Sequence, residues 1–184
     1  MVDKPFFERS STEVAEDLGL RVLRFSKKGL LHVPKETKSV VITQIVPYGT
    51  EQRYQPERTA NEKLKKSVEK AFREPGVIDM YFGRFGYVLA ISTGKEGEYS
   101  EISIHGAFPL SGFDQSGLHD LLGPLKLTKE MGIDKQMAIV LDGQPIYDNP
   151  MIQISDAKLS GTSRFDPKKV SPSALGSYYF SRSR

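Results

Sequence analysis

A carboxylate and a tyrosine stand two residues apart in the stretch IDMYFGRFGYVLAIS, residues 78–92, which predicts a β-hairpin. Successive side chains of a strand point to opposite faces, so we expect Asp79 and Tyr81 to share one face. A carboxylate can take a proton from water, and aromatic rings beside a cation such as Arg84 can contact a nucleic acid. Two plainer interpretations also fit: aromatic residues that only pack a sheet, and an Asp79 exposed to solvent at the hairpin edge.

The run Arg84-Phe85-Gly86-Tyr87-Val88 is similar to the aromatic strand with which RNA-recognition motifs stack bases, but it lacks their Gly between the basic residue and the first aromatic. The chain is about twice the size that such a module needs, and no partner aromatic strand in a βαββαβ order is found. Preference for single-stranded RNA over duplex DNA would support this alternative.

The composition is that of an ordinary soluble domain, with 184 residues, 38% of them hydrophobic and 10% aromatic. A net charge of +3 permits an anionic partner without requiring one. The absence of cysteine excludes disulfides, thiolate metal sites and a Cys nucleophile. The three histidines, His32, His105 and His119, have no metal-ligand spacing, so neither a metal nor a cofactor is expected.

The sequence also bears on location. Residues 1–18 mix acidic and basic side chains where a signal peptide has an apolar segment, and no apolar run approaches the length of a membrane span. We therefore expect a cytoplasmic monomer with no membrane association, close to the nucleoid, or nuclear in a eukaryote.

Helices and strands must position the hairpin. Ser10 and Glu13 form a capping-box pattern that predicts a short helix ending at Gly19. Pro124 and Gly132 predict a second helix, at its first position and just past its end. Strands are predicted at Arg21–Phe25, Leu30–Val33 and Ser39–Val46, with a turn at Pro34-Lys35-Glu36, and again at 101–110, 135–141 and within 176–184.

A further helix is predicted for residues 59–76, where apolar residues recur at helical spacing before Pro75-Gly76. Its basic face is interpreted as a solvated helix surface, or as a surface that lies on DNA. That face comprises Lys63, Lys65, Lys66, Lys70 and Arg73. Several strands joined by hairpins, with few helices, predict an α+β fold: one domain over residues 1–184, with a curved antiparallel β-sheet, flanking helices and a protruding β-hairpin.

Five segments resemble, in order and spacing, the alkyladenine (3-methyladenine) DNA glycosylase family. The last of them is the most specific, since it is similar to the family's Gly-Pro-x-Lys-Leu-x-x-Ala-Leu-Gly-Ile-Asp. The resemblance covers nearly the full chain, from Phe6 to about Arg164. The segments are FFERSSTEVAEDLGLRVLR, VVITQIVPYGT, EPGVIDMYFGRFGYVLAIS, HGAFPLSGF and GPLKLTKEMGIDK.

The resemblance implies an enzyme that flips an alkylated purine out of double-stranded DNA and hydrolyses its N-glycosidic bond. It places Tyr81 on a base-stacking tyrosine and Phe85, with one inserted residue nearby, on the intercalating residue at the hairpin tip. An apolar ring suits a wedge that replaces lost stacking, and Arg84 beside it can meet phosphate. Ser92 and Lys126 fall on further positions that bind the base or the DNA.

The catalytic positions of the family are altered in this chain. Gln44 stands where the family has its general-base Glu, and a neutral amide cannot accept a proton from water. A shifted register places Tyr48 on the family's tyrosine and puts Val46 at the Glu position. His105 replaces an Arg, so that a permanent cation gives way to a group that titrates near neutrality.

Two explanations are open for the missing Glu: another carboxylate activates water, or water activation is lost. Asp79 is our first substitute and Glu51 a weaker second, while Ser92, or Ile91 without a gap, stands for a family Asn. A cationic purine leaves as a neutral base, so positioning and electrostatic support can suffice for it. We therefore expect excision of cationic alkylpurines with little action on neutral lesions. The alternatives are a damaged-DNA-binding protein without catalysis and an unrelated α+β protein.

Overall fold

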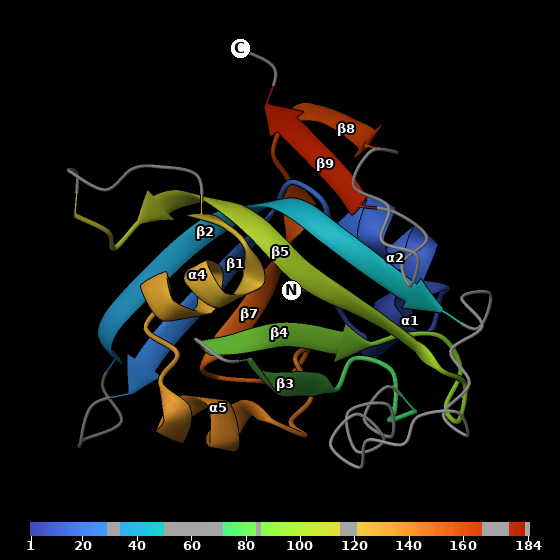
Figure 1. Cartoon of the computed structure of the whole chain (residues 1–184), viewed down its shortest axis with the longest axis horizontal. Coiled ribbons are helices and arrows are strands. Elements are labelled where there is room, and N and C mark those ends of the chain that lie inside the picture. The colour runs from blue at the N-terminus through green and yellow to red at the C-terminus, as the bar shows by residue number, and fades with distance from the viewer. Residues whose placement is uncertain (29–33, 50–71, 84–85, 115–120, 167–176, 183–184) are drawn as a thin grey trace.

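One curved antiparallel sheet organises the chain (Figure 1). The computed structural model describes residues 1–28, 34–49, 72–83, 86–114, 121–166 and 177–182. The strands follow the spatial order β3-β4-β5-β2-β1-β7, while β6 pairs with β5 and β9 pairs with both β2 and β8. This arrangement confirms the predicted α+β class. The strands are β1 (Arg21–Lys28), β2 (Pro34–Gly49), β3 (Ile78–Gly83), β4 (Gly86–Ser92), β5 (Ser100–Ser111), β6 (Leu121–Leu122), β7 (Ile152–Lys158), β8 (Gly161–Asp166) and β9 (Ser177–Arg182).

Short helices pack around this sheet. They are α1 (Lys4–Phe7), α2 (Ser11–Leu18), α4 (Pro124–Glu130) and α5 (Lys135–Leu141). The capping box of α2 is present in full, with Ser10 and Glu13 each bonded to the other's backbone N–H. Pro124 occupies the first turn of α4, and Gly132 beyond its end has a φ of 81°, both as predicted. Within the described residues, no helix has the length and hydropathy needed to cross a membrane.

Two predicted elements are wrong. Residues 135–141 form helix α5 instead of a strand, because the Asp134 carboxylate caps the helix at Met137 N and the two buried residues, Ala138 and Leu141, are three residues apart. The turn predicted at Pro34 is also absent. Pro34 is instead the first residue of β2, a position where its missing N–H is tolerated. Residues 30–33 lie outside the described residues.

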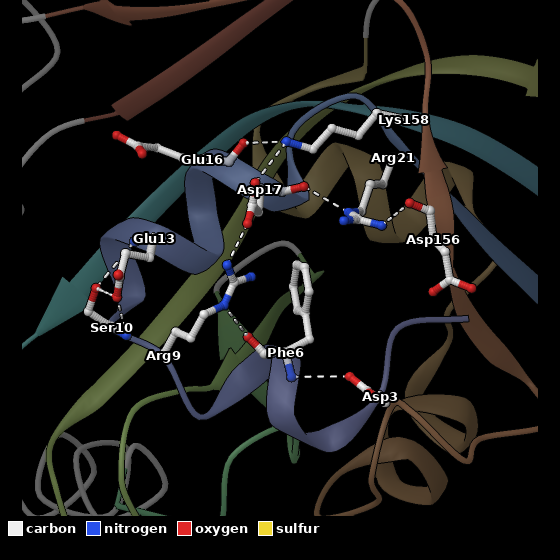
Figure 2. A network of polar contacts seen from close by, with 10 residues as sticks. All are labelled: Asp3, Phe6, Arg9, Ser10, Glu13, Glu16, Asp17, Arg21, Asp156 and Lys158. Atoms are coloured by element: carbon white, nitrogen blue, oxygen red, sulfur yellow. Dashed lines mark hydrogen bonds and ion pairs between the residues drawn. The ribbon is translucent and has the colours of Figure 1, made fainter.

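Charged side chains connect the N-terminal segment to Asp156 and Lys158 of β7 (Figure 2). The Phe6 ring lies between two guanidinium groups, with Arg9 Cζ 4.5 Å and Arg21 Cζ 4.8 Å from its centroid. Arg9 also pairs with Asp17, which in turn accepts from Lys158 Nζ at 3.2 Å. These contacts fix α1 and α2 against the end of β7, a strand that the sequence analysis did not predict.

The sheet opens between β4 and β5. These strands pair only from Ala90 to Ser92, and β5 then pairs with β6, where Gly106 lies opposite Leu122. Helix α4 packs against both β4 and β5 (Figure 1). Its buried Thr128 donates a hydrogen bond from Oγ1 to the Tyr87 carbonyl at 2.6 Å. The Gly-Pro segment and α4 therefore fill the place where the two strands separate.

Candidate functional site

The predicted hairpin exists as strands β3 and β4, and its register settles which side chains share a face. Ile78 lies opposite Ile91 and Met80 opposite Leu89, and all four belong to the hydrophobic core. Because side chains alternate along a strand, Asp79 and Tyr81 point to the other side of the sheet. Arg84 and Phe85 at the tip, together with Glu51 and the four lysines predicted on the basic helix, lie outside the described residues.

Cross-strand pairing extends this second face over four strands. Ser92 lies opposite Glu101, and Glu101 lies opposite Tyr48. On β3, Asp79 lies opposite Ala90 and Tyr81 lies opposite Val88, so both residues extend the same face across β4. We call the resulting set the polar face, and it comprises Tyr48, Asp79, Tyr81, Ser92 and Glu101.

Two compensating β-bulges shape the end of this face, between β2 and β5. Ile42 pairs with Ala107, whereas Gln44 pairs with Gly106. Between Ile42 and Gln44 the extra residue is Thr43 on β2, and between Gln44 and Ile45 it is His105 on β5. Bulges of this kind redirect a side chain and recur beside active sites. Here they bring together Gln44 and His105, two residues at which the sequence departs from the motifs it resembles.

Asp79 is fully buried and held from two directions. Arg73 donates from Nη1 to Asp79 Oδ1 at 2.8 Å, and Ser92 donates from Oγ to Oδ2 at 2.7 Å. The same guanidinium reaches Asp142, whose Oδ1 also accepts from Met80 N at 2.9 Å. The solvent-exposed interpretation of Asp79 is therefore wrong. Arg73, expected on an exposed basic face, instead forms a partly buried ion pair.

Glu101 is the second buried carboxylate of the polar face, and the sequence analysis missed it. Tyr81 donates its hydroxyl to Glu101 Oε2 at 2.6 Å. Burial and then the Glu101 charge raise the pKa of Tyr48 to about 12, and the same two causes raise the pKa of Tyr81 still further. Both phenols are therefore neutral donors at neutral pH. The alternation of Glu101, Ser103 and His105 along a predicted strand was the available signal.

His105 is partly buried, and burial lowers its pKa to about 4. The imidazole is thus neutral at physiological pH, whereas the sequence suggested a group titrating near neutrality. The His105 carbonyl accepts from Gly123 N at 2.7 Å, so the Gly-Pro segment holds the bulge in place. A neutral imidazole can accept a hydrogen bond at this position, but it supplies no positive charge.

Gln44 is buried beside the bulge and lies over Gly106. A methyl group added to Gly106 would approach Gln44 Cβ to 3.0 Å and Gln44 Oε1 to 3.3 Å. The Gln44 side chain is thus packed closely against Gly106, and a methyl group there would require Gln44 to shift by a few tenths of an ångström. Lys126 is exposed on α4, which packs against β4, and it is not on the polar face.

The polar face contains no metal set: among the residues that the structure describes, no three His, Asp or Glu side chains are placed to hold an ion. Its chemistry is that of hydrogen bonds, two carboxylates and two neutral phenols. No family model matches this chain, and no curated protein is significantly similar to it.

Proposed function

We propose that this protein binds duplex DNA, flips out positively charged alkylated purines and hydrolyses their N-glycosidic bonds. The observation that carries the proposal is the polar face. Tyr81 and Ser92, which were assigned through the resemblance to the alkyladenine DNA glycosylases, come from β3 and β4 and share this face with the substitute carboxylate Asp79, and Gln44 and His105 lie at the bulge beside it.

The proposed reaction requires a base to be gripped outside the duplex, at an unstacking cost of a few kcal/mol. Tyr81 offers an aromatic ring whose hydroxyl is fixed by Glu101, so the ring enters binding with little rotamer freedom left to lose. Departure of a cationic purine yields a neutral base, and the electron deficit stays on the sugar. Carboxylates near the sugar would stabilise that charge without accepting a proton.

Within this proposal, Asp79 is a positioning residue and not the base that activates water. Both of its oxygens are engaged and its side chain is fully buried, so a water molecule would have to displace Ser92 or Arg73 to reach it. Gln44 cannot accept the proton, and a histidine with a pKa near 4 is a weak base. Hydrolysis would then rely on the lability of the cationic substrate.

Single-turnover base release tests the proposal, with duplexes carrying 3-methyladenine, 7-methylguanine or hypoxanthine. We expect release of the two cationic bases and little release of hypoxanthine, with a strong loss of rate in Tyr81→Ala. Efficient hypoxanthine release would contradict the dependence on a cationic leaving group. An Asp79→Asn variant that is folded, yet loses activity on the methylated bases while still binding them, would return Asp79 to a direct catalytic role.

A second function is favoured by one observation, the absence of an accessible base at the altered positions. A protein with Gln44 at the family's Glu position and Asp79 sealed in an ion pair could recognise damaged DNA without cutting it. Preferential binding of a methylated duplex with no base release over long incubation would select this function.

A further inference from the structure

A cavity of about 470 Å³ lies where helix α2 begins, near the ends of β2 and β4 and the start of β5. Gly49 and Ser100 pair across β2 and β5 and line this cavity. Each is the sequence neighbour of a residue of the polar face, Tyr48 and Glu101 respectively. The cavity therefore adjoins the polar face, although none of its lining residues has a role in the proposed excision.

The first turn of α2 presents backbone donors at the cavity. The capping box satisfies the N–H groups of Ser10 and Glu13 (Figure 2). The N–H groups of Ser11 and Thr12, at the first two helical positions, donate to no other group in the part of the chain that the structure describes. The N-terminus of a helix carries partial positive charge and binds anions through such groups.

The Ser11 side chain is a second and independent sign of a ligand. Only 4% of this residue is exposed, and its hydroxyl has no hydrogen-bond partner among the described residues. Ser11 Oγ lies 3.2 Å from the position that a Cβ on Gly49 would take, and both residues line the cavity. Buried polar groups are normally hydrogen-bonded, so an unpartnered hydroxyl here indicates a group that binds in the cavity.

Three charged side chains at the cavity restrict which anion fits. Lys95 attracts an anion, whereas Glu8 and Glu98 repel it, and all three are exposed. Repulsion by a carboxylate increases with the charge of the ligand. A phosphodiester carries one negative charge, whereas a phosphomonoester carries almost two at neutral pH. The two glutamates therefore disfavour a monoester more strongly than a diester.

We propose that this cavity binds one phosphodiester of the DNA backbone, held by the N–H groups of Ser11 and Thr12, the Ser11 hydroxyl and the Lys95 ammonium. Its assignment to DNA rests on the proposed function, but the site contacts the backbone and not the flipped base. A phosphate fixed beside the polar face would set the register of the duplex on the protein, because phosphate contacts position a duplex whereas base contacts specify its sequence.

Four variants test the site through their affinity for an undamaged duplex. Ser11→Ala removes the hydroxyl and should weaken binding about tenfold, since hydrogen bonds to charged groups are strong. Lys95→Gln should reduce by about 1 the slope of log affinity against log salt concentration. Glu98→Gln should tighten binding, because it removes a repulsive charge. The matched control is Lys135→Gln, at an exposed lysine that begins α5 and does not line the cavity; it should leave affinity and slope unchanged.

Lys95 is exposed, so Lys95→Gln tests the site even if Ser11→Ala lowers the melting temperature. Amide resonances of isotope-labelled protein then show where a small phosphate binds, with thymidylyl-thymidine as the diester and thymidine monophosphate as the monoester. We expect the Ser11 and Thr12 resonances to shift with the diester and less with the monoester. Larger shifts with the monoester overturn the choice of a phosphodiester. Absence of shifts with both, or unchanged duplex affinity in both Ser11→Ala and Lys95→Gln, overturns the site.

Base release from a methylated duplex is measured on the same proteins, so that the two proposals can fail separately. A wild type that binds the duplex through Ser11 and Lys95 but releases no base supports the phosphate site and overturns excision. Base release by the wild type, with unchanged duplex affinity in the Ser11 and Lys95 variants, keeps excision and overturns the site. Binding of the dinucleotide without binding of the duplex overturns both the assignment of the site to DNA and excision.

Discussion

The buried imidazole of His105 makes the stability of the fold depend on pH in a way that one substitution removes. Its pKa is about 4 in the folded chain against 6.5 as an ordinary value, so the unfolded chain binds the proton more tightly. Stability from this group is complete above the unfolded pKa and decreases as the pH falls from about 6.5 toward about 4. Lowering the pH from about 8 to about 5 therefore decreases the free energy of unfolding by about 2 kcal/mol through this one group.

Urea unfolding across this pH range, for the wild type and for His105→Gln, measures the effect. The variant lacks the titrating group but keeps every other ionisable side chain, so subtraction of the two pH profiles isolates His105. We expect the wild-type profile to fall more steeply below about pH 6.5, by about 2 kcal/mol in total at pH 5. Parallel profiles for the two proteins would refute the desolvated, neutral imidazole.

Three further substitutions probe the packing around the site. Gly106→Ala should cost about 1–3 kcal/mol through its contact with Gln44, and thermal melts should show this cost fall in a Gln44→Ala background; an undiminished cost would place the strain elsewhere. Thr128→Val should cost about 1–2 kcal/mol in urea unfolding, because it leaves the half-buried Tyr87 carbonyl without that donor, and an unaltered midpoint would show that α4 does not depend on it. Asp79→Asn should cost about 3 kcal/mol or more by breaking a buried ion pair, and a near-wild-type melting temperature would argue that the pair is not stabilising.

The sequence carried the local signals of this fold well. The capping box at Ser10 and the proline and glycine that bracket α4 are rules about neighbouring residues, and both hold. The shared face of Asp79 and Tyr81 follows from strand alternation, and it also holds. The strand predicted for residues 135–141 was wrong because a seven-residue apolar run is compatible with either a strand or a helix. The contact that favours the helix is the cap from Asp134.

The parts of the site that were missed depend on contacts between distant segments. Asp79 pairs with Arg73, whose side chain was predicted to lie on the solvent-exposed face of a helix. The bulges around Gln44 and His105 arise from the register of β2 against β5, which no local pattern encodes. Glu101 is recognised as part of the site only through its hydrogen bond from Tyr81, which lies on another strand. The chemical character of the side chains could be inferred from the sequence, whereas the strand pairing that places them together could be read only from the structure.

The attachment of β1 to β7 has a consequence for how the chain is made. Strand β1 completes its pairing with a segment more than a hundred residues further on, and Arg21 bonds to the carbonyl of Ser155 across a separation of 134 residues. During synthesis the N-terminal residues leave the ribosome long before β7 exists, so one edge of β1 has no native partner for most of translation. Closure of the sheet is then a late, long-range event, and ribosome-bound chains that stop before Ile152 should be sensitive to protease at their N-terminal strand.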